Sequence, residues 1–247
     1  PHAIGFTDFT FQYPMSQVKN LQQISLHLKK GQTLGIVGKT GAGKTTFIRQ
    51  LLMEYPLGNG QIVIGDVDLS KLTKEQVLDW IGYVPQDHVL FSRTIRENIL
   101  FGKEDATEED IRDAIRLAYF EKDLAHLPMG LETLVGEKGV SLSGGQKQRV
   151  SIARALIKNP EVLILDDSLS AVDAKTESKI IENIQTERAG KTTIISTHRL
   201  SGIQHADEII VLDEGIIVER GTHDELLALG GWYKEQYDRQ QLEEVSE

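Results

Sequence analysis

The sequence predicts an α/β fold in which helices cover both faces of a mostly parallel β-sheet. Compact apolar runs of strand length alternate with helical segments, as in a buried parallel sheet. These runs are residues 33–38, 161–165, 192–196 and 208–212. Shorter alternating segments fit an N-terminal antiparallel β subdomain, and they are residues 6–13, 23–29 and 61–68. A charged stretch with apolar residues at helical spacing, residues 92–126, predicts an inserted α-helical subdomain.

Three helices are predicted, and they cover about residues 43–54, 143–158 and 174–187. Residues typical of helix starts and stops indicate where these helices begin and end. The first must end near Pro56, and the second ends at Asn159-Pro160, because proline cannot continue a helix. Thr107 and the three acidic residues after it predict a further helix start inside the insertion. The tail, residues 238–247, is polar and charged, so we expect it to be loosely held.

Composition narrows the function before any motif is considered. With 247 residues, 40% of them hydrophobic and 26% charged, the chain has the make-up of a globular protein that forms one large domain. Lys and Arg number 27 against 37 Asp and Glu, a net charge of −10. Without an overall basic field, nucleic acid is not an expected partner. The absence of Cys excludes disulfides and thiol chemistry.

Neither a membrane span nor a leader is recognisable. No apolar run approaches 18 residues, and the first residues, PHAIGF, have no basic region followed by an apolar one. Because the chain begins at Pro1 without an initiator Met, we treat it as a piece of a longer polypeptide, as a hypothesis.

A phosphate-binding loop is the strongest chemical signal. Residues 38–45, GKTGAGKT, fit the pattern G-x-x-x-x-G-K-[ST] between a predicted strand and a predicted helix. Its glycines let backbone N–H groups turn towards phosphate oxygens, and the helix N-terminus adds positive potential. Lys44 would reach the β- and γ-phosphates, and Thr45 would ligate magnesium. The chain has no N-K-x-D sequence, which favours ATP over GTP; the alternative is a glycine-rich turn without a ligand.

The apolar strand at 161–165 ends in two carboxylates, Asp166 and Asp167. Its uninterrupted apolar residues predict a central strand, so Asp166 emerges at the carboxyl end of the sheet. There it could hold magnesium through a water molecule, with Asp167 beside the γ-phosphate. The alternative is that both are helix caps or turn residues.

A second anion site is predicted at residues 142–146, LSGGQ. Ser143 would be the N-cap of the helix that follows, and Gly144 and Gly145 would expose backbone N–H groups. With the phosphate loop and the acidic strand end, this string makes the chain resemble the nucleotide-binding domain of ATP-binding cassette (ABC) transporters over essentially its full length.

The resemblance implies a P-loop NTPase with a RecA-like core. Residues 1–247 would be a single ABC ATPase domain, with the β subdomain and the core in residues 1–86 and 158–247 and the helical subdomain in about 87–157. The family's Walker A loop, signature and Walker B strand match residues 38–46, 142–146 and 162–166.

Four single residues also match the family, in the family's order and spacing. Tyr13, in FQYP, resembles the aromatic residue that stacks on adenine, and Gln86, in VPQD, resembles the Q-loop glutamine that senses magnesium and the transmembrane partner. Asp173, in SAVD, resembles a residue of the D-loop. His198, after the predicted strand at 192–196, resembles the switch histidine that contacts the γ-phosphate. Taken alone, Tyr13, Gln86 and His198 would each have a structural interpretation.

The resemblance implies ATP and Mg²⁺ as cofactors. The implied catalytic residues are Lys44, Gln86, Asp167 and His198, and the implied metal site consists of Thr45, Gln86 and Asp166. The implied nucleotide-binding residues are Tyr13, Gly38, Lys39, Thr40, Gly41, Ala42, Gly43, Lys44, Thr45, Thr46, Ser143, Gly144, Gly145, Gln146 and Asp173.

Residues 133–139, TLVGEKG, resemble the X-loop of ABC exporters, in which Glu137 would lie near the coupling helices of the membrane domain. The resemblance therefore implies an exporter of multidrug or lipid type. Its partners would be a transmembrane domain and a second nucleotide-binding domain facing this one head to tail. The domain would then lie at the cytoplasmic face of the cell membrane.

One position departs from the family pattern. Competent cassettes have Glu after the Walker B Asp, whereas this chain has Asp167. The carboxylate is withdrawn by about 1.5 Å, and a misplacement of about 1 Å can cost on the order of 10²-fold in rate. We therefore expect weak hydrolysis at this site with ATP binding retained. An intact signature beside a shortened carboxylate predicts one half of a heterodimeric exporter whose partner bears Glu.

Three alternatives remain open at this stage. Asp167 could serve adequately in a homodimeric exporter with both sites active. The chain could instead be a soluble non-transport ABC ATPase, although the X-loop-like segment and the acidic composition count against that. It could also be a regulatory nucleotide-binding module without turnover.

Overall fold

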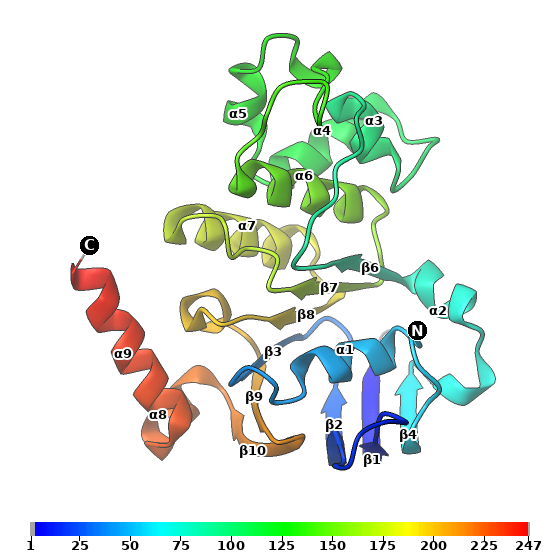
Figure 1. The fold of residues 1–247 in the computed structure, drawn as a ribbon, viewed down its shortest axis with the longest axis vertical. Helices are drawn as coiled ribbons and strands as arrows, with labels where there is room; N and C mark the ends of the chain where they lie inside the picture. Colours follow the sequence, from blue (N-terminus) through cyan, green and yellow to red (C-terminus); the bar gives the residue numbers. More distant parts are fainter. Residues whose placement is uncertain (1–2, 247) are drawn as a thin grey trace. The chain divides into compact units, whose positions relative to one another are not determined.

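The computed structural model describes residues 3–246. It divides into two compact units, residues 1–81 with 190–247 and residues 82–189 (Figure 1). The predicted helical subdomain of about 87–157 falls within the second unit, and its separation from the core stays a prediction.

The first unit contains the predicted antiparallel sheet, with strand order β2-β1-β4-β5. Its strands are β1 (Ile4–Phe11), β2 (Leu21–Leu28), β4 (Asn59–Ile64) and β5 (Val67–Asp68). The prediction of one strand over residues 61–68 was wrong, because Gly65 at φ 64° turns the chain and the segment forms a short hairpin. Left-handed backbone at this position is readily adopted by glycine.

A second group of strands in the first unit has the order β10-β9-β3-β8. These strands are β3 (Thr33–Gly38), β8 (Thr192–Ser196), β9 (Glu208–Asp213) and β10 (Ile216–Gly221). β3 pairs in parallel with both β8 and β9, and every residue of β3 is buried. The continuous apolar runs therefore form the parallel core that the sequence predicts.

Helices of the first unit complete its core, and they are α1 (Lys44–Leu51), α2 (Lys74–Trp80), α8 (His223–Leu229) and α9 (Trp232–Ser246). Short 3₁₀ turns η1 (Leu69–Lys71) and η3 (Leu200–Ile203) join them. Phe47 of α1 stacks on Phe6 of β1 with ring centroids 4.5 Å apart, which packs the phosphate-loop helix against the antiparallel sheet. The described residues of the tail belong to α9, a helix that the sequence did not predict, and that the tail is loosely held stays a prediction.

The second unit contains two neighbouring strands, β6 (Ile81–Val84, beginning at the boundary) and β7 (Val162–Asp166). Its helices are α3 (Ile95–Leu100), α4 (Glu108–Leu117), α5 (Glu121–Ala125), α6 (Gly144–Ile157) and α7 (Ala174–Glu187), with a 3₁₀ turn η2 (Gly130–Glu132). Thr107 caps α4 through a capping box with Asp110, as predicted. α6 packs against α3 and α4 with most of its residues buried.

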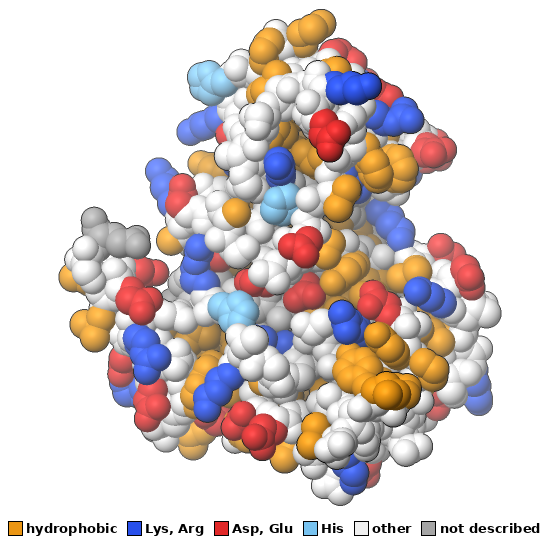
Figure 2. Space-filling model, in the orientation of Figure 1, with side chains coloured by type: hydrophobic (Ala, Val, Ile, Leu, Met, Phe, Trp, Pro, Cys, Tyr) orange, Lys and Arg blue, Asp and Glu red, His pale blue; other side chains and the backbone are white. Residues whose placement is uncertain are grey.

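Within residues 3–246, no helix is both long and apolar enough to cross a lipid bilayer. The face shown in Figure 2 has basic and acidic side chains interspersed.

Candidate functional site

The phosphate loop joins the end of β3 to the start of α1 in the first unit. A Cβ at Gly38 would lie 2.4 Å from the carbonyl oxygen of Leu212, so only glycine fits beside β9 at this point. Gly43, at φ 115°, precedes the first residue of the helix. The first N–H groups of α1 have no acceptor within the helix, and the helix dipole adds positive potential around them. The loop therefore has the geometry of an anion site.

Lys44 is 8% exposed and holds its ammonium group against the loop. Its Nζ donates to the carbonyl oxygen of Gly38 over 2.6 Å and lies 3.4 Å from Nδ1 of His198. His198 comes just after β8, so the fold brings together two predicted residues that are 154 positions apart. A cation and a histidine at one loop are suited to binding the terminal phosphates of a nucleotide.

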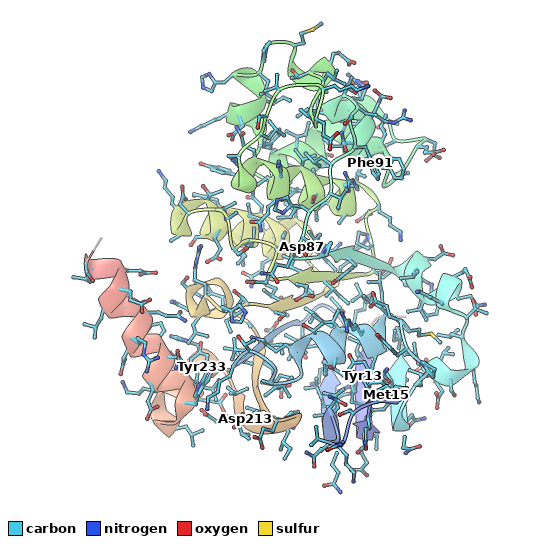
Figure 3. The ribbon with its side chains drawn as sticks, in the orientation of Figure 1. Tyr13, Met15, Asp87, Phe91, Asp213 and Tyr233 are labelled. Carbon is cyan, nitrogen blue, oxygen red and sulfur yellow. The ribbon has the colours of Figure 1, made fainter. Side chains whose placement is uncertain are left out.

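Tyr13 lies in the loop after β1 and is fixed by bonds at both of its ends. Its backbone N–H donates to Asn20 Oδ1 over 3.0 Å, and its hydroxyl lies 3.1 Å from Thr46 Oγ1. The ring makes edge contacts with Phe11 and Tyr55. Figure 3 shows Tyr13 next to α1, where its hydroxyl meets Thr46. Its stacking on adenine stays a prediction.

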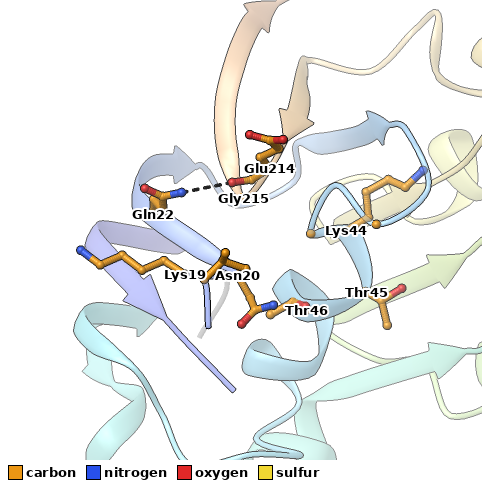
Figure 4. A pocket seen from close by; sticks show the side chains of 11 residues that line it. Lys19, Asn20, Gln22, Lys44, Thr45, Thr46, Glu214 and Gly215 are labelled. Atoms are coloured by element: carbon orange, nitrogen blue, oxygen red, sulfur yellow. Dashed lines mark hydrogen bonds between the residues drawn. The ribbon is translucent and has the colours of Figure 1, made fainter. Parts of the chain in front are cut away.

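A pocket of about 460 Å³ opens at this loop (Figure 4). Predicted residues line one side of it, namely Gly41, Gly43, Lys44, Thr45 and Thr46, while Val18, Lys19, Asn20, Gln22, Glu214 and Gly215 complete it. Sequence patterns did not predict this second group. Gly215 between two apolar runs is a turn signal that could have placed the turn between β9 and β10, because glycine readily adopts positive φ.

That hairpin turn is bonded to the phosphate loop. Glu214 and Gly215 both have positive φ, at 49° and 78°, and the N–H of Gly215 donates to the carbonyl oxygen of Ala42 over 2.9 Å. The donor set of the pocket, which comprises helix N–H groups, an ammonium and threonine hydroxyls, fits a polyphosphate with a bound divalent cation.

In the second unit, the carboxylate of Asp166 at the end of β7, and the segment that follows it, are bonded to the neighbouring strand β6. The hydroxyl of Tyr83 donates to Oδ2 of Asp166 over 3.1 Å, and the hydroxyl of Ser168 donates to the carbonyl oxygen of Val84 over 2.6 Å. Asp167, between these bonded residues, has φ 50°. Left-handed backbone is uncommon for residues other than glycine and clusters at functional sites.

Gln86 follows β6 by two residues and is exposed. Because Tyr83 and Val84 bond to the segment after β7, the strand that leads to Gln86 is attached directly to the acidic strand end. Three predicted residues, Gln86, Asp166 and Asp167, therefore lie at the ends of neighbouring strands. Tyr83 was not predicted, because nothing in its local sequence indicates this long-range bond.

The signature string caps α6, as predicted. Ser143 Oγ accepts from the N–H of Gln146, whose side chain accepts from the N–H of Ser143. A Cβ at Gly145 would lie 2.9 Å from the carbonyl oxygen of Ala171, so the glycine allows the D-loop to approach closely. The side chain of Gln148 bonds Ser170 Oγ over 2.9 Å and the N–H of Ala171 over 2.8 Å. Signature and D-loop are thus joined.

Asp173, at the end of the D-loop, caps α7 by accepting from the N–H of Thr176 over 2.7 Å. Bonds from Thr176 lower the pKa of the Asp173 carboxyl. Asp173 is therefore a helix cap in the structure, and a role towards nucleotide stays a prediction.

The X-loop-like segment lines a second pocket, of about 480 Å³. Gly136 and Glu137 come from that segment, while His88, Val89 and Leu90 follow Gln86 in the chain. Residues of the X-loop-like segment and residues that follow Gln86 therefore line the same pocket within the second unit.

Comparison with known proteins gives consistent results. The family model described as ABC transporter matches residues 21–170. The chain is 63% identical over 242 residues to the probable multidrug resistance ABC transporter ATP-binding/permease protein YheI of Bacillus subtilis, covering 98% of this chain and 41% of that protein. It is 46% identical over 233 residues to the multidrug resistance-like ATP-binding protein MdlA of Escherichia coli, covering 94% of this chain and 40% of that protein.

Among solved structures, a bacterial Atm1-family ABC exporter with ATP bound superposes with a TM-score of 0.91 at 39% identity. The match covers 97% of this chain and 42% of that chain. The chain thus spans about two fifths of these relatives. The α/β fold with an antiparallel N-terminal sheet and a mostly parallel core is confirmed.

Proposed function

This chain belongs to the ABC transporter family as an ATP-binding domain, and from that premise we propose that it powers an exporter by binding and slowly hydrolysing ATP. The phosphate loop carries the proposal, since Lys44, Gly38 and His198 converge there. The printed descriptions of the relatives, multidrug resistance proteins and an exporter, support export as the direction of transport.

In the proposed mechanism, N–H groups at the start of α1 and the ammonium of Lys44 bind the β- and γ-phosphates of ATP. Tyr13 stacks on adenine, and His198 contacts the γ-phosphate from the loop after β8. The family resemblance implies that Thr45, Gln86 and Asp166 are the residues that would hold Mg²⁺, which would neutralise charge on the phosphates. Asp167 orients the attacking water. The signature of a second cassette, including the serine that corresponds to Ser143, closes over the nucleotide.

Asp167 makes this turnover slow. Glutamate at this position would extend about 1.5 Å further, and an error of about 1 Å in a reacting group can cost on the order of 10²-fold. The left-handed backbone of Asp167 and the bonds on either side of it oppose a shift that would compensate. ATP binding depends on other residues and is retained.

An intact signature beside a shortened carboxylate supports an asymmetric pair. We propose a heterodimer in which the signature of this chain, Ser143 to Gln146, completes a competent site on a partner that bears Glu. The full transporter would include a transmembrane domain contacted through Gln86 and the segment at 133–139, and this domain would lie at the cytoplasmic face of the membrane. No nucleic acid is involved.

The test is Mg-ATP turnover of the 247-residue chain beside its Asp167→Glu variant, with ATP affinity measured in parallel. We expect the variant to turn over about 10²-fold faster, with affinity unchanged within about twofold because the phosphate loop is intact. Asp79→Glu, on the exposed surface of α2, is the matched control and should leave turnover unchanged. Equal and brisk turnover of wild type and Asp167→Glu would contradict the asymmetric pair and favour a homodimer with two active sites.

A further inference from the structure

The loop that carries His198 is bonded to the C-terminal helix by one side chain, Gln240 of α9. Its Nε2 donates to the backbone carbonyl of His198 over 2.7 Å, and its Oε1 accepts from the backbone N–H of Leu200 over 2.9 Å. One amide thus bonds the chain on both sides of Arg199. All of these residues belong to the first unit.

The bond from Gln240 to Leu200 caps the start of the 3₁₀ turn η3. Leu200 is the first residue of η3, and the preceding N-cap residue, Arg199, makes no side-chain capping bond. The N–H of Leu200 is therefore capped from α9 instead of from its own turn. Thr197 fixes the other side of the loop, with its N–H bonded to the carbonyl oxygen of Ile36 over 3.2 Å and its hydroxyl accepting from Arg199 over 3.0 Å.

α9 itself is firmly attached up to Gln240. Tyr233 is fully buried, and the carboxylate of Glu219 accepts from the N–H of Trp232 over 2.8 Å at the start of the helix. The hydroxyl of Tyr233 lies 2.7 Å from Nδ1 of His223. Burial lowers the pKa of His223 and raises that of Tyr233, which agrees with a tyrosine O–H donating to a neutral imidazole.

The contacts of α9 follow one helical face. Tyr233, Tyr237 and Gln240 are spaced by four and three residues, and the ring of Tyr237 packs edge-on against His223. Beyond Gln240 the helix leaves this surface, since Leu242 and Val245 are 71% and 86% exposed. Gln240 therefore lies towards the end of an attached stretch that begins at Tyr233, which is labelled in Figure 3.

We infer that Gln240 is a positioning residue, which fixes the backbone of His198 so that its imidazole faces the ammonium of Lys44. The inference rests on the proposed function, in which His198 contacts the γ-phosphate. A glutamine amide supplies one donor and one acceptor, as the two bonds require. Glutamate keeps the acceptor for Leu200 but loses the donor to His198, whereas methionine has a similar length and loses both.

The test compares Gln240→Met and Gln240→Glu with Gln241→Met, a neighbouring glutamine on the same helix, in the 247-residue chain. The first measurement is amide hydrogen exchange at Leu200, which should be about tenfold faster in Gln240→Met and protected in Gln240→Glu and Gln241→Met. The second is the affinity for Mg-AMP-PNP and Mg-ADP. Only AMP-PNP retains a γ-position, so both Gln240 variants should lose about 3- to 10-fold in AMP-PNP affinity, with ADP affinity unchanged.

A His198→Ala variant tests the proposed role of His198 separately from the inferred role of Gln240. If it leaves the preference for AMP-PNP over ADP unchanged, the role proposed for His198 is wrong, and the role of Gln240 falls with it. If His198→Ala lowers the preference but neither Gln240 variant does, the inference alone is overturned, even if exchange at Leu200 accelerates. If Gln240→Met does not fold, Gln240→Glu provides the test, because it keeps the cap of η3. The quantity measured is again the affinity for Mg-AMP-PNP relative to the affinity for Mg-ADP.

Discussion

In the first unit, the candidate phosphate site consists mainly of backbone, whereas in the second unit the candidate chemistry depends on carboxylate side chains. The phosphate loop is defined by Gly38, which lies against β9, by helix N–H groups and by one buried lysine. The acidic strand end depends on where Asp166 and Asp167 place their oxygens, and hydroxyls from Tyr83 and Ser168 hold that segment.

Because of this difference, a substitution can change the rate of ATP hydrolysis without changing nucleotide affinity. Backbone donors do not change when a nearby side chain is replaced, so nucleotide affinity tolerates substitutions outside the loop. A carboxylate that activates water is sensitive to one methylene group. A chain can therefore lose turnover and keep binding, which is the state proposed for the site with Asp167.

The largest effect is expected where the first unit does depend on a side chain. Lys44→Met removes an ammonium that is buried against Gly38 and that we propose binds the phosphates. Bonds from a charged donor contribute about 1.5–3 kcal/mol each, and two phosphates are involved, so ATP affinity should fall by roughly a hundredfold or more. Equilibrium binding of a fluorescent ATP analogue gives the value.

The matched control is Lys30→Met, which removes the same charge from an exposed position of the same unit. It should leave ATP affinity within about twofold. A Lys44→Met chain that binds ATP as well as the control would show that backbone donors suffice and that the lysine has no binding role.

A smaller effect is expected in the second unit from Tyr83→Phe, which removes only the hydroxyl that donates to Asp166. One bond to a carboxylate contributes about 1–2 kcal/mol, so the Mg²⁺ concentration that half-saturates the gain in ATP affinity should rise about 5- to 30-fold. ATP affinity in EDTA should be unchanged. Titration of Mg²⁺ against nucleotide binding measures both quantities.

Tyr119→Phe removes a tyrosine hydroxyl elsewhere in the same unit and serves as the control. It should leave the Mg²⁺ dependence unchanged. If Tyr83→Phe lowers ATP affinity in EDTA and in Mg²⁺ equally, the hydroxyl supports the general fold of the strand ends and does not orient the carboxylate.

Sequence patterns predicted the parts of the fold that bury continuous apolar surface or begin at a cap. The strand at 33–38 and the helix at 174–187 match their observed limits. β6 was missed because four residues with a central glycine show no periodicity, and β10 because its exposed and half-buried residues alternate on an edge strand. α9 was missed because its contacts depend on a few residues in an otherwise polar segment.

The candidate site shows the same division. Short strings predicted the phosphate loop, the signature and the acidic strand end, because each places its chemistry within a few consecutive residues. Tyr83 and Gln240 could not be predicted, because their partners lie 83 and 42 positions away and only the folded chain brings them together. Long-range bonds of this kind leave no local signal in a single sequence.

The smallest expected effect concerns the ion pair beneath the signature helix. Asp123 accepts from Arg149 over 2.6 Å and from the side chain of Gln146 over 3.2 Å. Burial raises the pKa of the Asp123 carboxyl, but the bonds from Arg149 and Gln146 outweigh it, and the pKa lies below its ordinary value of 3.8. The ionised form is therefore stabilised by folding.

This shift fixes the sign of the pH dependence. A lowered pKa in the folded state adds stability that is fully present above the unfolded value and is lost as the pH falls through the folded value. Asp123→Asn should lower the free energy of unfolding at pH 7 by about 1–2 kcal/mol, and the difference from wild type should shrink below about pH 3.8. Urea unfolding at several pH values, with an NMR titration of the Asp123 carboxyl, measures both.

The control is Asp113→Asn, because the carboxylate of Asp113 makes an exposed bond to Arg116. This substitution should change the free energy of unfolding much less. If Asp123 titrated at its ordinary value, the bonds to Arg149 and Gln146 would not favour the charged form, and the signature helix would depend on its Ser143 cap and its packing alone.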